Sequence, residues 1–245
     1  MEKQPLLNTY VNNLDMKETV QAIEHMITSG DRSYVVAINV DVVMKIEKDA
    51  YLKQITDCAD MVLVDGMPIV WIAKWYKNKL KAKISGSDLV PSLCKRAAKK
   101  GYSIFIIGGG AGIAEKAKSN LEKDMPGINI VGTYAPPIGF EKDEIELDKI
   151  NQMISGAHPD LIIACFGCPK QEKWVYENYQ KYDAKVSICA GATVDFLAGN
   201  VNRAPQWMSD HGLEWFYRFT QEPKRMFKRY FVDDIKIFKL IWKYR

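Results

Sequence analysis

Residues 104–121, IFIIGGGAGIAEKAKSNL, join an apolar run to a glycine turn and an amphipathic segment. This order predicts a buried strand, a tight turn and a helix. The unpaired N–H groups and the positive dipole end of such a helix attract an anion, as in phosphate-binding loops. Gly108, Gly109 and Gly110 are therefore candidate phosphate-binding residues. The alternative is that these glycines only allow the helix to pack closely against the strand.

The glycine spacing separates this turn from two known nucleotide motifs. Gly108 and Gly110 match the first two glycines of the dinucleotide fingerprint G-x-G-x-x-G, but Ile113 stands at the third position. No G-K-[ST] follows to make a P-loop. A second glycine turn, CAGATVDF (189–196), follows another apolar run. Two such turns on one rim of a sheet favour a nucleotide diphosphate as the ligand.

The same strand-and-helix order recurs along the chain. Predicted strands are SYVVAIN (33–39), MVLVDG (61–66), YSIFIIGGG (102–110), INIVG (128–132), DLIIACFG (160–167) and KVSICAG (185–191). Predicted helices span about 16–29, 42–58, 88–100, 113–123, 142–154 and 169–182. This alternation predicts a Rossmann-like α/β fold, with a mostly parallel sheet flanked by helices on both faces and a helical C-terminal extension.

The composition changes near residue 200, where the predicted strands stop. Residues 201–245 hold ten Lys and Arg against five Asp and Glu, a net charge of +5, whereas residues 1–200 hold 24 against 25, a net charge of −1. We therefore expect an α/β domain over 1–200 and a basic helical segment over 201–245. Such a segment indicates a partner with phosphate groups, either a membrane surface or a nucleotide, although a solvated basic face is commoner.

Length and composition restrict the class of protein. The chain has 245 residues, of which 47% are hydrophobic and 26% charged, as in soluble globular proteins. Five cysteines at irregular spacings and an opening segment without a signal pattern predict a cytoplasmic protein with reduced thiols. The longest apolar runs are far shorter than the roughly 20 residues that span a bilayer. The three histidines do not follow predicted strands, so Ser-His-Asp and His-metal sites are disfavoured.

The turn CFGCPKQEKW (165–174) allows two interpretations. Cys165 and Cys168 form a C-x-x-C pair between a strand and a helix, where thioredoxin-type redox motifs lie. A redox domain of that type is about half this length, and one C-x-x-C falls short of a structural zinc site. Lys170 adds a positive charge beside a helix N-terminus, which is unfavourable unless an anion answers it. A bound substrate anion is therefore the alternative to redox chemistry.

Several stretches together resemble one family, the WecG/TagA/CpsF glycosyltransferases. They cover nearly the whole chain and include INVDVV (38–43), VDGMPIVW (64–71), GCPKQEKW (167–174) and AGATVDFLAGNVNRAPQWMSDHGLEWFYRFTQEPKR (190–225). The resemblance implies transfer of a sugar from a UDP donor to a polyprenyl-diphosphate-linked saccharide, with inversion at the anomeric carbon, in cell-surface polysaccharide or teichoic acid synthesis. It also implies a peripheral position on the inner face of the plasma membrane. A non-catalytic nucleotide-binding module is the alternative, and we expect no nucleic-acid partner.

The resemblance assigns roles to individual residues. Asp65 matches the candidate general base, and Asn39 matches the amide near the acceptor. Positions around the nucleotide and the C-terminal segment that completes the site correspond to Lys83, Lys170, Gln171, Glu172, Gly191, Asp195, Arg203, Arg218, Arg225 and Arg229. N-acetylmannosamine is the sugar that the resemblance implies. Ala37 stands where Thr is usual and Lys83 where Arg is usual, which leaves glucose, galactose and a uronic acid open.

The residues can supply the chemistry of inverting transfer, which needs a base for the acceptor hydroxyl and positive groups for the departing UDP. Asp65 follows the apolar run MVLV, where burial would raise the pKa of its carboxyl group. Its alternative role is the N-cap of a helix over MPIVWIAKW. No D-x-D pair follows a predicted strand. We therefore expect that no metal is required, and that arginines and glycine-turn N–H groups bind the diphosphate.

The last 17 residues, RYFVDDIKIFKLIWKYR (229–245), predict an amphipathic helix. Phe231, Ile235, Phe238 and Trp242 recur at helical spacing on one face, and Lys236, Lys239 and Lys243 lie on another. An aromatic face beside lysines suits an anionic membrane interface. The alternative is a helix that packs on its own domain or on a partner subunit, so a homo-oligomer stays open.

Overall fold

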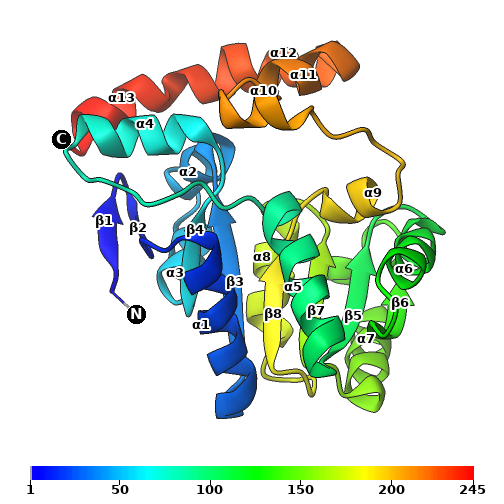
Figure 1. The fold of residues 1–245 in the computed structure, drawn as a ribbon. Helices are drawn as coiled ribbons and strands as arrows, with labels where there is room; N and C mark the ends of the chain where they lie inside the picture. The colour runs from blue at the N-terminus through cyan, green and yellow to red at the C-terminus, as the bar shows by residue number, and fades with distance from the viewer. Residues whose placement is uncertain (1) are drawn as a thin grey trace.

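The computed structural model describes residues 2–245, apart from the side chains of residues 206, 210 and 225. Its centre is a six-stranded, wholly parallel sheet in the order β4-β3-β8-β7-β5-β6 (Figure 1). The strands are β3 (Ser33–Ile38), β4 (Met61–Val64), β5 (Ser103–Gly108), β6 (Asn129–Tyr134), β7 (Leu161–Cys165) and β8 (Val186–Cys189). The six predicted strands and the Rossmann-like α/β class are confirmed.

Helices cover both faces of this sheet. One face packs against α2 (Val40–Ile46), α3 (Ala50–Asp57), α4 (Met67–Trp75), α7 (Glu144–Ala157), α8 (Lys170–Asn178) and α13 (Ile237–Lys243). The other packs against α1 (Met16–Ser29), α5 (Gly86–Lys100), α6 (Ile113–Asp124) and α9 (Thr193–Leu197). Since successive residues of a strand face opposite sides, a strand covered on both sides is apolar throughout. The continuous apolar runs of the sequence have this cause.

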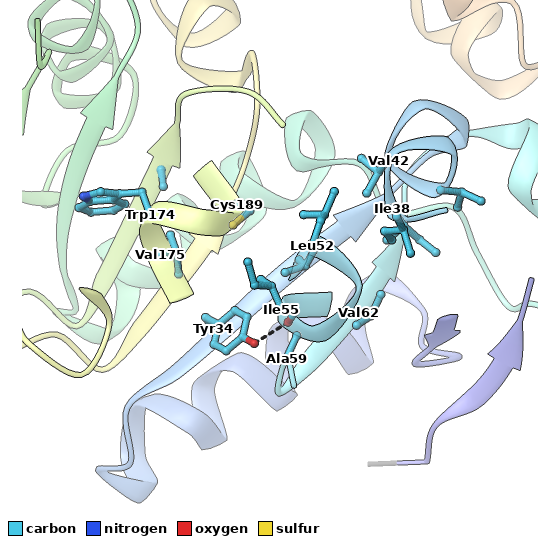
Figure 2. Close-up of a cluster of buried hydrophobic side chains, with 14 of the residues drawn as sticks. Tyr34, Ile38, Val42, Leu52, Ile55, Ala59, Val62, Trp174, Val175 and Cys189 are labelled. Atoms are coloured by element: carbon cyan, nitrogen blue, oxygen red, sulfur yellow. Dashed lines mark hydrogen bonds between the residues drawn. The ribbon is translucent and has the colours of Figure 1, made fainter. Parts of the chain in front are cut away.

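Figure 2 shows the core on the α2 and α3 side of the sheet. Tyr34 is fully buried there, and its hydroxyl donates a hydrogen bond to the Ile55 carbonyl oxygen at 2.6 Å. Trp174 of α8 is buried in the same cluster, with Tyr182 stacked on it at 5.7 Å between ring centroids. The motif residue Trp174 therefore anchors α8 to the sheet, which fixes the turn that precedes α8.

Two features depart from the predicted elements. The predicted helix 42–58 is two helices, because Asp49 caps α3 by accepting hydrogen bonds from the N–H groups of Tyr51 and Leu52. A separate antiparallel hairpin of β1 (Gln4–Leu6) and β2 (Thr9–Val11) precedes α1. Helix α4 begins after Gly66 without a side-chain cap, so Asp65 does not have the capping role.

The C-terminal segment crosses the rim at the carboxyl ends of the strands (Figure 1). It contains α10 (Gln206–Asp210), α11 (Glu214–Gln221), α12 (Pro223–Phe227), a π-helical turn (Lys228–Asp233), a 3₁₀ turn (Asp234–Lys236) and α13. Ile237 and Leu240 are buried in the core cluster of the α2 and α3 side. None of the helices within residues 2–245 is long and apolar enough to cross a membrane. The domain boundary at residue 200 stays a prediction.

Candidate active site

A polar cavity of about 450 Å³ lies at the carboxyl ends of β3, β4, β7 and β8. This is the position where ligands bind in parallel α/β sheets. Its walls come from the turns after these strands, the start of α5 and the C-terminal segment. Its lining includes Asn39, Asp41, Lys45, Asp65, Gly167, Cys168, Gln171, Glu172, Gly191, Arg218, Lys228 and Arg229.

An apolar cavity, also of about 450 Å³, lies beside the polar one. It is bounded by Met67 and Pro68 at the start of α4 and by aliphatic and aromatic side chains of the C-terminal segment, namely Trp215, Tyr230, Phe231, Ile235, Ile237 and Phe238. Four residues line both cavities: Asn39, Asp65, Arg218 and Arg229. The two cavities therefore meet at these four side chains, all of which the sequence had marked as site residues.

Asn39 and Asp65 are held against each other at this junction. Asn39 caps α2, and its Oδ1 accepts a hydrogen bond from the Val42 N–H at 3.1 Å. That bond turns the amide nitrogen towards Asp65, where Nδ2 donates to Oδ2 at 3.4 Å. The Asp65 N–H donates to the Ile38 carbonyl oxygen at 2.8 Å, which fixes the backbone beside β3. Asn39 thus positions one carboxylate oxygen of Asp65.

The environment of Asp65 suits a base that works near neutral pH. Burial raises the pKa of its carboxyl group, and the nearby Glu214 carboxylate raises it further. Arg218, Lys83 and the Asn39 hydrogen bond act in the opposite direction. A carboxylate whose pKa is raised holds a proton more strongly and is therefore a better proton acceptor.

Gln171 joins two turns of the polar cavity. Its Oε1 accepts hydrogen bonds from the Gly167 N–H at 3.2 Å and the Gly191 N–H at 3.0 Å, after β7 and β8 respectively. Its Nε2 donates to Oε1 of the fully buried Glu172 at 2.8 Å. Burial raises the pKa of Glu172. The sequence analysis predicted that Gly191 binds the nucleotide. In the structure, the Gly191 N–H donates its hydrogen bond to Gln171.

Several sequence-predicted residues lie outside the polar cavity. Gly108 packs against the β7 backbone, where an added Cβ would come within 2.4 Å of the Cys165 carbonyl oxygen, so close packing accounts for this glycine. Gly109 and Gly110 do not line the cavity either. The positive charge of Lys170 is answered by a protein carboxylate, Glu141, at 3.1 Å. Contact between these residues and a phosphate stays a prediction.

Other predicted residues form ion pairs or hydrogen bonds with protein groups near the site. Arg203 pairs with Asp88 and donates to the Ser87 carbonyl oxygen at 3.3 Å, which ties the C-terminal segment to α5. Lys83 lies in the apolar cavity, 3.4 Å from an Asp88 oxygen. Asp195 of α9 accepts a hydrogen bond from the Asn200 amide at 3.1 Å and does not line the polar cavity. The side chain of Arg225 lies outside the described residues.

The arginines Arg218 and Arg229 do reach the cavities. Arg218 pairs with Glu214 one turn earlier at 2.7 Å, and its guanidinium lies over the Phe196 ring at 5.4 Å. Arg229 lies 3.7 Å from an oxygen of Asp234 and 3.9 Å from one of Asp41. Both guanidinium groups are thus held in place while they face the junction of the two cavities.

The sequence interpretation missed two lysines of the polar cavity, Lys45 and Lys228. Lys45 pairs with Asp41 at 2.7 Å and donates to the Cys168 carbonyl oxygen at 2.9 Å. Because α2 begins at Val40, after the Asn39 cap, Asp41 and Lys45 lie on one face at i, i+4 spacing, and this signal could have identified Lys45. Lys228 is exposed and has no ion pair among residues 2–245 apart from the three undescribed side chains.

The cysteines offer little for redox chemistry. Burial raises the pKa of the Cys165 thiol to about 12 and also raises the pKa values of Cys168 and Cys189. Because the thiolate is the reactive form, these thiols are held in the inert state. The Cys168–Pro169 peptide bond is cis. Within the described part of the chain, no group of three or more His, Cys, Asp and Glu side chains is arranged to hold a metal ion.

The rim of this parallel α/β sheet holds a partly buried aspartate between a polar and an apolar cavity, an arrangement typical of an enzyme active site. The chain belongs to the glycosyl transferase WecG/TagA/CpsF family, whose model matches residues 4–245. Family membership confirms the predicted transferase, in place of a binding module or a redox protein.

Two relatives from Bacillus carry the same name, N-acetylglucosaminyldiphosphoundecaprenol N-acetyl-beta-D-mannosaminyltransferase. The protein from Bacillus subtilis (strain 168) is 28% identical over 226 residues, which is 92% of this chain and 86% of the relative. The protein from Bacillus spizizenii (strain ATCC 23059 / NRRL B-14472 / W23) is 28% identical over 222 residues, or 88% and 84% of the two chains.

Proposed function

We propose that this glycosyltransferase moves N-acetylmannosamine or a related hexose from a UDP donor to a saccharide linked to polyprenyl diphosphate, in cell-wall polymer synthesis. The names of the two relatives describe such an acceptor and such a sugar. The position of Asp65 carries the proposal, because this side chain lines both the polar and the apolar cavity. A base at that junction can reach an acceptor on one side while the donor lies on the other.

Asp65 is the general base in this mechanism. Its Oδ2 faces the Asn39 amide, and its Oδ1 has no hydrogen-bond partner among the described residues, so Oδ1 accepts the proton of the acceptor hydroxyl. The hydroxyl oxygen bonds to the anomeric carbon as the bond from that carbon to the UDP oxygen breaks. The electron pair of the broken bond leaves with UDP. Attack from the side opposite to UDP inverts the anomeric configuration.

The donor occupies the polar cavity in this proposal. Lys45, Arg218, Lys228 and Arg229 line it and provide positive charge for a diphosphate that gains negative charge as it leaves. Arginine can bind phosphate oxygens in bidentate fashion. We therefore propose that transfer needs no metal ion. Activity that survives an excess of chelator supports this, and a loss that Mg²⁺ restores overturns it.

The acceptor occupies the apolar cavity, with its saccharide towards Asp65 and its polyprenyl chain towards the exposed end of the C-terminal segment. Phe231, Ile235 and Phe238 provide the apolar wall. The protein then works as a cytoplasmic, peripheral enzyme on the inner face of the plasma membrane.

A screen of UDP-sugars against a short-chain GlcNAc-diphosphate lipid tests the function. We expect release of UDP together with a disaccharide product for one UDP-hexose, with UDP-N-acetylmannosamine the first to try. Nuclear magnetic resonance of the product should show the anomeric configuration opposite to that of the donor. Retention of configuration, or no transfer from any UDP-sugar, would overturn the proposal.

A further inference from the structure

Helix α4 exposes two tryptophans on its outer face. Trp71 is 50% and Trp75 is 69% exposed, whereas Ile69, Ile72 and Ala73 of the same helix are buried. Residues four apart lie on one side of a helix, so the two rings form a short aromatic ridge. Exposed single aromatics are common, but adjacent ones rimmed by polar residues mark an interaction surface.

The C-terminal helices expose a second aromatic ridge. Phe231, Ile235, Phe238 and Trp242 are 47%, 52%, 66% and 78% exposed. The segment is anchored by a different face, since Ile237 and Leu240 are buried in the core. The sequence analysis treated a helix packed on its own domain and a helix with an exposed apolar face as alternatives. The segment has both properties.

The two ridges belong to one surface. Helices α4 and α13 lie side by side at the same end of the molecule (Figure 1). The Tyr76 hydroxyl, at the end of α4, donates a hydrogen bond to the Ile241 carbonyl oxygen at 2.8 Å. Trp75 lines a shallow cavity together with Tyr244 and Arg245, the last residues of the chain. Segments about 170 residues apart in the sequence thus build a continuous face, named here the two-helix face.

Positive charge predominates around the two-helix face, where Lys243 and Tyr244 contact Glu47 and Lys236 lies 4.0 Å from Asp233. Residues 67–85 contain five lysines and no acidic residue, and residues 236–245 contain three lysines, one arginine and no acidic residue. Lys74, Lys77 and Lys239 are exposed and form no ion pair with any described side chain. An aromatic surface with a basic rim is complementary to an anionic lipid surface, where tryptophan rings lie at the headgroup level. A second copy of the chain would bring like charges together.

The apolar cavity connects this face to the candidate base. Met67 and Pro68 from the start of α4 and Phe238 from α13 line the cavity, and Asp65 lies at its inner end. A lipid-linked acceptor could therefore pass from the face to the base without crossing water. This step rests on the proposed function, whereas the composition of the face does not.

We propose that α4 supplies half of a lipid-docking surface, in which Trp71 and Trp75 enter the interface of an anionic bilayer beside Phe238 and Trp242 of the C-terminal segment. Attachment by two helices orients the protein, because contacts along two neighbouring helices fix the tilt of the face relative to the bilayer. A single C-terminal helix would leave the molecule free to rock about its axis.

Sedimentation of the full-length protein with vesicles tests the contribution of α4. The probes are vesicles of phosphatidylcholine with about one third phosphatidylglycerol and vesicles of phosphatidylcholine alone. We expect W71A/W75A to weaken binding to the anionic vesicles by about tenfold or more, which corresponds to about 1.4 kcal/mol. The single variant W75A should show part of this loss, and circular dichroism melts verify the folding of both. High salt should weaken binding of the wild type.

The matched control is I138A/I145A, which removes two side chains that are 103% and 83% exposed and lie outside the two-helix face. This variant should bind anionic vesicles as the wild type does. Wild-type binding by W71A/W75A, with a loss only in W242A, would overturn the proposal. The proposal would also be overturned if the wild type did not bind vesicles but formed a dimer in sedimentation equilibrium that W71A/W75A abolished. The face would then be an interface between copies of the chain.

Activity separates this proposal from the proposed function. Transfer to a short-chain, water-soluble acceptor should be unchanged in W75A, because the Trp75 ring lines neither the polar nor the apolar cavity. A protein that binds anionic vesicles through α4 but transfers no sugar to the soluble acceptor would refute the proposed function and leave the docking surface standing.

Discussion

The polar and the apolar cavity have the same volume and share four side chains, but they are built in different ways. The polar cavity is made largely from turns that directly follow parallel strands, to which the start of α5 and the C-terminal segment add further lining residues. The apolar cavity is made where α4 meets helices more than 140 residues further along the chain. Most of the polar cavity lies on the rim of the sheet, whereas the aromatic and aliphatic wall of the apolar cavity comes mainly from the docked C-terminal segment.

The difference suggests a division of labour between the cavities. A rigid rim with buried hydrogen bonds, such as those of Gln171, suits a polar donor that must be held in one orientation. A wall of exposed aromatic and aliphatic side chains suits an apolar chain, because hydrophobic contacts do not require one fixed orientation of the ligand. If this division holds, changes at the junction should affect the chemistry, and changes in one cavity should affect one substrate.

Asp65→Asn tests the junction and should have the largest effect. Loss of a positioned base should lower turnover by about 10²–10⁴-fold while both substrates still bind. In the wild type, the raised pKa of Asp65 places the acidic limb of the kcat/KM profile above the range of an ordinary aspartate, and activity should fall as pH drops through it. Steady-state kinetics over pH measure both. Wild-type turnover in the variant would remove Asp65 from the mechanism.

Arg218→Ala tests whether a junction cation acts on the leaving diphosphate. Removal of a group that stabilises charge in the transition state should lower kcat by about 10²-fold. Arg96→Ala is the matched control, since that arginine pairs with Glu24 at 2.7 Å and lines neither cavity. Exposed ion pairs contribute little, so this control should change kcat by less than about threefold. Equal losses in both variants would contradict the assignment of the cavity.

Ile235→Glu tests the apolar wall alone. A carboxylate there should raise KM for the short-chain lipid acceptor by about tenfold, the equivalent of about 1.4 kcal/mol. The affinity for UDP, measured by calorimetry, should stay unchanged because Ile235 lines only the apolar cavity. Ile235→Val keeps the apolar character and serves as control. A parallel loss of UDP affinity would show that the two cavities do not act separately.

The smallest expected effect is on stability. The pKa of Asp65 is higher in the folded than in the unfolded protein, so the unfolded chain loses its proton first as pH rises, and the free energy of unfolding falls over that interval. An asparagine side chain does not ionise, so the variant does not lose stability over this pH interval. Asp65→Asn should therefore melt a few degrees above the wild type at neutral pH, at about 2–4 °C per kcal/mol. The difference should vanish below about pH 3.9, and a lower melting temperature at neutral pH would contradict the burial argument.

The sheet could be predicted from the sequence because most strands are short, largely apolar runs followed by a turn residue, whereas the edge strand β6 is more polar and only partly buried. The break between α2 and α3 was missed because the apolar spacing continues through it, and only the cap at Asp49 marks the new helix. The four junction residues followed from strand ends and family motifs. The role of glycines 108–110 could not be predicted from local sequence. Only a glycine fits at position 108, because the carbonyl group of Cys165, which is distant in sequence, lies too close for a Cβ.

Charged residues were harder to place than strands. Lys170 and Arg203 have partners from distant elements, Glu141 and Asp88, and neither pairing has a signal in local sequence. Whether a cation faces a cavity or a carboxylate depends on tertiary packing. The exposed ridge of α4 was hidden for a similar reason, because its partner ridge lies at the other end of the chain.

The bonding of Gln171 has a consequence for which side chains this position can accept. One end must accept hydrogen from two backbone N–H groups, and the other end must give hydrogen to the Glu172 carboxyl group. A glutamate has the length but offers no donor when ionised, a lysine offers no acceptor, and an asparagine is one carbon too short. Glutamine alone among the common amino acids has that reach and that polarity at both ends, so chemistry rather than volume should keep this position fixed.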